Sequence, residues 1–330
     1  MSGQPPTTGR RALPWVLGAC GCALVLVIAI GAVAGGLWFA ASRGGDGTPP
    51  TAEAPTTESP TTEQPTTEKP TFRVASPMDP PTGDAEALRA VLEDNPVLDV
   101  SLSPPESCDV PTAKGPLTVK QLQAFLDAAA PCLDRTFSSG FSDQNLPWHG
   151  PDVVAYTWPH VPEDATCDKD SFSKTAVRYC LLDETIYWPT TVAAGTGTGK
   201  ADATETTQLY YFQLALVYGS VAEANSSLVS YYTQYLHGVE GDEDLSDEAT
   251  RRFRAQVVCL GAAAAGSAPG DLAPGDAVST YEQSEGTWTT DDSGKAIAVK
   301  TTIHWVGEGL EADGDLGACN TWAAPAEQVA

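Results

Sequence analysis

Side chains that could bind a metal or transfer a proton are few and widely spaced in this chain. The histidines are His149, His160, His237 and His304. No two of them stand one helical turn apart, the spacing at which two imidazoles bind zinc from one face of a helix. We therefore expect each histidine in a loop or on a helix surface, and no metal or cofactor in the protein.

Three other stretches contain residue types that occur in binding or catalytic sites. The glycine-rich run at 195–200 lacks the spacing of a phosphate-binding loop, because alanines stand at both of its ends. The acidic run at 242–248 lacks the spacing and the glycine of an EF-hand, so a solvated loop is expected. Ser220 has no nucleophile elbow around it. We predict no catalytic residue at any of them.

The elements that would position functional groups follow from the hydrophobic pattern. Helices are expected at residues 85–93, 118–133, 206–224, 247–265 and 296–310. Strands are expected at residues 152–157 and 184–188. Thr118 begins a capping box, Pro131 should kink or end the second helix, and Ser246 should cap the fourth. Few strands among several helices indicate an α+β fold with a small mixed sheet.

The helix expected at 206–224 carries the sequence Gln-Leu-Ala-Leu-Val-Tyr-Gly-Ser at residues 213–220. Ala215, Tyr218 and Gly219 match in place the pattern A-H-E-Y-G-H-H-V-Q. Matching stretches stand in the same order elsewhere: Cys132 to Arg135, Cys167 and Cys180 with Thr185 to Pro189, Arg251 to Cys259, and Ala318 to Trp322. Over residues 108–322 the chain resembles the bacterial neutral zinc metallopeptidase-like family.

The positions that hold the metal in this family carry residues without zinc chemistry here. The resemblance places two ligands at Leu216 and Ser220 and the general base at Val217. It places the third ligand at Arg254 and a further carboxylate at Val258. Leucine and valine cannot bind a metal, and the guanidinium of Arg254 stays charged and would repel a cation. The resemblance thus implies a peptidase-like shape without peptidase chemistry.

A zincin-like fold with an erased metal site implies a pseudopeptidase rather than an enzyme. An open cleft lined by Tyr187, Tyr218 and Arg254 would indicate a binding or regulatory protein, whose partner is a protein, a peptide or an envelope component. A packed interior at the former ligand positions would indicate a structural scaffold instead. A hydrolase with a relocated active site is a third alternative. A buried Arg254 would need a partner, such as Glu223 or a carboxylate of the ligand.

The cysteines indicate an oxidising compartment. The chain has eight, of which two lie in a long apolar run near the N-terminus and six lie beyond it. An even number in an extracytoplasmic domain indicates disulfides, although six cysteines permit fifteen connectivities. The resemblance favours the pairs Cys108 with Cys132, Cys167 with Cys180, and Cys259 with Cys319.

The apolar run at residues 12–42 contains no charged side chain and exceeds the roughly 20 residues needed to cross a bilayer. We expect an uncleaved transmembrane helix there. Arg10 and Arg11 should hold residues 1–11 in the cytoplasm and place the rest of the chain outside. Cys20 ends a lipoprotein-like cleavage box, so its lipidation is left open.

Between this run and the folded part, residues 43–83 form a stalk in which Pro-Thr-Thr-Glu recurs, so an extended, disordered linker is expected. We expect residues 84–330 to form one extracytoplasmic domain on the bacterial cell envelope. The chain has 43 acidic and 18 basic residues, a net charge of −25. This balance argues against nucleic acid and against direct adhesion to anionic lipid. It would suit solubility, cationic partners or loose binding of divalent cations.

Overall fold

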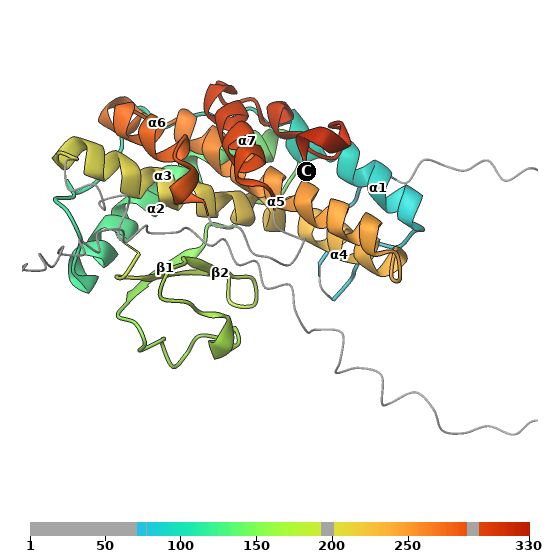
Figure 1. The fold of residues 1–330 in the computed structure, drawn as a ribbon, viewed down its shortest axis with the longest axis horizontal. Helices are drawn as coiled ribbons and strands as arrows, with labels where there is room; N and C mark the ends of the chain where they lie inside the picture. Colours follow the sequence, from blue (N-terminus) through green and yellow to red (C-terminus); the bar gives the residue numbers. More distant parts are fainter. Residues whose placement is uncertain (1–70, 77, 193–200, 289–296) are drawn as a thin grey trace, which may run out of the picture.

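A computed structural model describes residues 71–76, 78–192, 201–288 and 297–330. Figure 1 shows most helices gathered in one layer, with a small sheet and its loops on one side. The helices are α1 (Ala85–Glu93), α2 (Val119–Asp143), α3 (Ala203–Asn225), α4 (Leu228–Gly238), α5 (Glu243–Gly266), α6 (Asp276–Glu282) and α7 (Val299–Glu311). The strands are β1 (Asp152–Tyr156), β2 (Arg178–Cys180) and β3 (Thr185–Pro189).

The predicted fold class requires a correction. The described residues form seven α-helices and a three-stranded sheet, which agrees with an α+β fold. No helix in these ranges is long and apolar enough to cross a membrane. The apolar helix α3 is instead buried on nearly all sides by other parts of the domain. The transmembrane helix predicted at residues 12–42 lies outside the described residues, as do residues 1–11 and the stalk up to residue 70.

The sheet has the strand order β1-β3-β2, with β1 parallel and β2 antiparallel to β3. Both strands predicted from the sequence are present within one residue of their expected ends. The free edge of β1 is covered by α2, because the side chain of Gln123 bonds to two backbone groups of the strand. Its Oε1 accepts from the N–H of Ala155 at 2.8 Å, and its Nε2 donates to the carbonyl of Val153 at 2.8 Å.

Helix α2 begins at the predicted capping box of Thr118 and Gln121 but does not end at Pro131. It continues to Asp143, because the turns after Pro131 bury a further apolar stripe that includes Phe137 and Phe141. The predicted end of this helix near Pro131 is therefore wrong. Burial of the later turns outweighs the missing N–H of the proline.

Helices α3 and α5 pack with their backbones in close contact. A Cβ built on Gly219 would overlap the carbonyl oxygen of Val257, and a Cβ built on Gly261 would lie 2.5 Å from the Cα of Leu216. Only glycine allows so close an approach at these two positions. The helix α5 is capped by the side chain of Asp242, not by Ser246, so it starts earlier than predicted.

The chain that enters the domain is docked on α4. Phe72 stacks on Tyr231 with ring centroids 5.9 Å apart, and the N–H of Arg73 donates to the hydroxyl of Tyr231 at 3.0 Å. The N–H of Ala75 donates to Oγ of Ser227 at 2.9 Å. Ser227 is the residue that precedes α4, and its φ of 62° places it in the left-handed region. The sequence signals did not predict α4, because this start has no side-chain cap.

The described residues contain three disulfides, and they are the pairs favoured by the resemblance. They join Cys108 to Cys132, Cys167 to Cys180, and Cys259 to Cys319. The last pair ties α5 to the short turn η6 (Leu316–Cys319) near the C-terminus. The two remaining cysteines of the chain lie outside the described residues. The disulfide prediction is therefore confirmed.

Candidate functional site

The positions that the resemblance assigns to a metal site lie in the packed interior of α3. Leu216 and Val217 are fully buried, and Ser220 is 7 % exposed. The backbone contact between α3 and α5 occurs at Leu216 and at Gly219, between these same positions. Side chains and backbone therefore fill the region around Leu216 in which a metal would have to sit.

The two α5 positions of the predicted metal site differ from each other. Val258 is buried, whereas Arg254 is half-buried. Glu223, suggested as the partner of Arg254, is fully buried, and in the described structure both of its carboxylate oxygens are without a hydrogen-bond partner. No ion pair joins Glu223 to Arg254 within the described ranges, so the suggested pairing is wrong. Burial raises the pKa of the Glu223 carboxyl well above its usual value.

The two tyrosines predicted to line a cleft lie at different depths. Tyr218 is fully buried, and its hydroxyl donates to the carbonyl of Ala130 at 3.1 Å and to Oδ1 of Asp134 at 3.2 Å. Tyr187 of β3 lines a pocket, and its hydroxyl donates to Oδ2 of Asp183 at 3.0 Å. Of the three side chains predicted to line the cleft, Tyr187 lies in the pocket wall, Tyr218 lies behind the wall, and Arg254 is not among the lining residues.

This pocket has a volume of about 480 Å³ and lies between α2, the start of β1, β3 and the loop at residues 157–177. Its polar lining consists of Asp127, Asp134, Asp152, Asp164, Thr185 and Tyr187. No lysine or arginine is among its described lining residues. The pocket is thus a negatively charged hollow beside the sheet.

The carboxyl of Asp134 has a perturbed pKa. Its carboxyl is half-buried, and burial raises its pKa from the usual 3.8 to about 6, while the hydrogen bond from Tyr218 acts in the opposite direction. Gly150 packs directly against this carboxyl, since a Cβ on Gly150 would overlap its oxygens. Asp134 is therefore held in place by α3 on one side and by the backbone before β1 on the other.

The remaining candidates from the sequence do not converge on a site. The four histidines are exposed and lie in separate places: two in loops around β1, one at the end of α4 and one on α7. The described residues contain no group of three or more His, Cys, Asp or Glu side chains placed to hold a metal. The prediction of a solvated loop at 242–248 is wrong, because Asp242 caps α5 and residues 243–248 form the first turns of this helix. Glu243 and Asp244 are exposed, whereas Glu248 is half-buried and pairs with Arg252 at 2.7 Å. The glycine-rich run at 195–200 lies outside the described residues.

Sequence reasoning missed the acidic lining of the pocket. Asp127 and Asp134 are two helical turns apart on α2, which places both on one face. Asp152 begins β1 and Asp164 lies in the following loop, so only the tertiary packing brings them to the same hollow. The spacing on α2 was the one signal in the sequence, and two acidic residues on a helix are too common to predict a site.

Comparison of the chain with protein-family models, with curated proteins and with solved structures gives no match. The resemblance to neutral zinc metallopeptidases therefore stays a prediction, based on the motifs quoted above. The pocket and its chemistry are independent of that resemblance.

Proposed function

We propose that this protein is an extracytoplasmic, non-catalytic binding protein, a pseudopeptidase whose ligand occupies the acidic pocket between α2 and β1. The observation that carries the proposal is the pocket itself, a hollow of about 480 Å³ with four aspartates in its lining. Pockets of this size, with a few convergent polar groups, are typical of ligand sites. The disulfides support an oxidising, extracytoplasmic location.

The absence of catalysis is part of this proposal and is supported by chemistry at the former metal positions. Leu216 and Val217 offer neither a ligand atom nor a proton, and Arg254 carries a fixed positive charge. The close contact of α3 with α5 leaves side chains and backbone where zinc would need open space. A catalytic zinc needs three protein ligands and a free coordination position.

The ligand should carry a positive charge, and we propose a primary ammonium group. Several carboxylates around one hollow attract a cation. Asp127, Asp152 and Asp164 are exposed, so water screens their charges more than that of the half-buried Asp134. Asp134 is the best placed to bind it, because Tyr218 and Gly150 fix its position. The net charge of −25 would also draw a cationic peptide or envelope component toward the domain.

The proposal can be tested with Nα-acetyl-lysine amide as the probe and Nα-acetyl-norleucine amide as the control, which lacks the ammonium group. We expect the full chain to bind the lysine probe with a dissociation constant of about 1 mM or tighter, measured by chemical-shift titration. Asp134→Asn should weaken binding about tenfold. Asp143→Asn, on the same helix but exposed and away from the pocket, should leave it unchanged. Equal binding of both probes would exclude an ammonium site.

A structural scaffold is the second candidate function. The observation in its favour is the packed interior at Leu216, where the resemblance had placed an open metal site. The same titration separates the two proposals. A scaffold without a ligand site should bind neither probe, and Asp134→Asn should then have no effect beyond a change in stability.

A further inference from the structure

The loop between β1 and β2, residues 157–177, packs on a small hydrophobic cluster of its own. This cluster consists of Tyr156, Cys167, Phe172, Cys180 and Tyr187, and it is separate from the main core. The one regular element within the loop is the short 3-10 turn Lys169–Ser171. Apart from Val177 at its end, which belongs to the main core, the loop is therefore a satellite of the domain.

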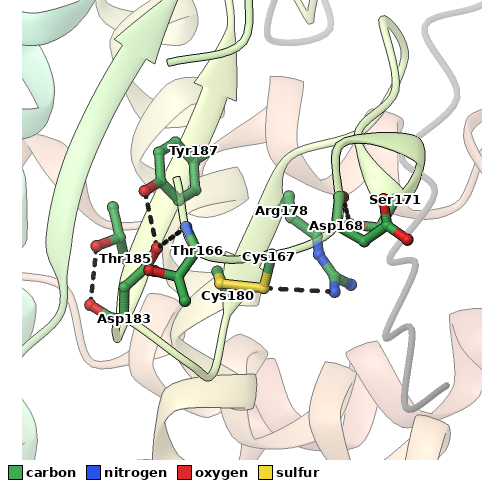
Figure 2. Close-up of a disulfide and its surroundings, with 9 residues drawn as sticks. All are labelled: Thr166, Cys167, Asp168, Ser171, Arg178, Cys180, Asp183, Thr185 and Tyr187. Carbon is green, nitrogen blue, oxygen red and sulfur yellow. Dashed lines mark hydrogen bonds between the residues drawn. A yellow bond between two sulfur atoms is a disulfide. The ribbon is translucent and has the colours of Figure 1, made fainter. Parts of the chain in front are cut away.

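The Tyr156 hydroxyl of β1 donates to the carbonyl of Ser173 in the loop at 3.4 Å. Two further links hold the loop against the sheet, and Figure 2 shows both. The first is the disulfide between Cys167 in the loop and Cys180 in β2. The second is the carboxylate of Asp183: its Oδ2 accepts from the N–H of Thr166 at 2.8 Å and from the hydroxyl of Tyr187 at 3.0 Å. One oxygen thus connects the residue next to the disulfide with a tyrosine of the pocket.

The position of the loop affects the pocket directly. Asp164, which lies three residues before Cys167, is one of the lining aspartates. Tyr187 belongs both to the small cluster and to the pocket wall. If the loop moved away, the pocket would lose the carboxylate of Asp164. Asp183, which accepts from the Tyr187 hydroxyl, would lose its bond from the N–H of Thr166.

We propose that the Cys167–Cys180 disulfide and Asp183 together clamp the 157–177 loop against the pocket. Opening this disulfide would release the loop and weaken ligand binding while the helical layer stays folded. The part of this proposal that concerns the ligand rests on the proposed function. The helical layer should survive because Cys132 and Cys259, one from each of the other disulfides, are buried in the main core.

A dithiol can open the clamp by thiol–disulfide exchange. Its thiolate attacks one sulfur of the pair and forms a mixed disulfide, and its second thiol then closes on the first. The protein gains two electrons and two protons as the thiols of Cys167 and Cys180, while the dithiol becomes a cyclic disulfide. The guanidinium of Arg178 donates to Sγ of Cys167 at 3.9 Å, so its charge stabilises the thiolate of Cys167 once the disulfide is open.

The first experiment removes the disulfide by the double change Cys167→Ser and Cys180→Ser in the full chain. Amide hydrogen exchange, measured by mass spectrometry, should become at least about tenfold faster in peptides from 157–177 and stay unchanged in α3 and α5. Asp168→Asn is the matched control, because Asp168 caps the 3-10 turn of the same loop without contacting the clamp. Unchanged exchange in the loop, or faster exchange in α3 and α5 as well, would overturn the proposal.

The second experiment tests Asp183 as the positioning residue. Asp183→Asn should speed exchange at the Thr166 amide and lower the pKa of Tyr187, which burial together with Asp183 raises to about 12. Tyr187→Phe should leave the Thr166 amide protected. A Thr166 amide that stays equally protected in Asp183→Asn would show that Asp183 does not hold the loop.

The lysine probe then separates the two proposals. If the parent binds it, the disulfide-free variant should bind at least about fivefold more weakly, and equal binding would contradict the clamp. If the parent does not bind it, the proposed function fails. Hydrogen exchange still decides in that case whether the clamp exists, because it needs no ligand.

Discussion

The hydroxyl of Tyr218 donates a hydrogen bond to Oδ1 of Asp134 across 3.2 Å, and through this contact the buried helix α3 reaches the acidic pocket. A hydrogen bond to a carboxylate favours its ionised form. Tyr218 therefore moderates the effect of burial on Asp134, whose pKa is about 6.

Replacing Tyr218 by phenylalanine should raise the pKa of Asp134 further above 6, because the donor is lost while the burial stays. The loss of the bond should cost about 1 kcal/mol of stability. The pKa can be followed through the carboxyl carbon shift of Asp134 as the pH is changed. A pKa that stays or falls would mean that the contact does not act on the ionised form.

Asp134→Asn should change how stability depends on pH. The pKa of Asp134 in the folded state, about 6, lies above the usual 3.8, so the fold favours the protonated form. Its contribution to stability is fully present below about pH 4 and is lost as the pH rises through 6. Relative to the asparagine variant, the parent should lose about 1 to 2 kcal/mol over this window, after allowance for partial exposure.

This comparison needs urea unfolding of both proteins at several pH values between 4 and 7.5. Besides burial, the groups that act on Asp134 are the side chains of Tyr218, Trp148 and Arg135, all of which lower its pKa. The other aspartates in the pocket lining are Asp127, Asp152 and Asp164. Asp143→Asn should reproduce the parent's profile. A constant difference between parent and Asp134→Asn would contradict the raised pKa.

Glu223→Gln should stabilise the domain at neutral pH. Both oxygens of Glu223 lack a partner in the described structure, and burial raises its pKa well above 4.5, so ionisation costs free energy in the folded state only. The contribution of the protonated form is fully present below about pH 4.5 and is lost as the pH rises toward the raised pKa. We expect the variant to gain about 1 to 3 kcal/mol at pH 8 and less at pH 4.5, measured by thermal unfolding.

Gly219→Ala should destabilise the domain by about 3 kcal/mol or more, because the new methyl overlaps the carbonyl of Val257 and forces α3 away from α5. Gly307→Ala on α7 is the matched control. No atom lies within 4 Å of a Cβ at that position, so alanine should stabilise the helix by about 0.5 to 1 kcal/mol. Similar melting temperatures for both variants would show that the α3–α5 contact tolerates separation.

Much of the fold follows from local signals in the sequence. The helix at 85–93 and the capping box at Thr118 were predicted correctly, because each is defined by its own residues. Helix α4 and the later turns of α2 were missed for opposite reasons. Helix α4 has no side-chain cap at Ser227 that would mark its start. In α2, Pro131 indicates a helix end that the structure does not have. In both cases burial against other elements decides the structure, and local sequence does not show it.

The candidate site was harder to predict than the fold. The resemblance directed attention to Leu216 and Ser220, which the structure buries. The pocket depends on Asp134 and Asp164, which are distant in the chain and meet only because α2 packs along β1. Tyr187 was the one residue predicted for a cleft that lies in the pocket wall.

The docking of residues 72–75 on α4 also determines how the domain bears mechanical load. A pull on the chain from its N-terminal side acts first on the stacked rings of Phe72 and Tyr231 and on the bonds from Arg73 and Ala75. These contacts transmit tension into α4. None of these anchoring residues lines the acidic pocket, so the load enters the domain at a place separate from the proposed ligand site.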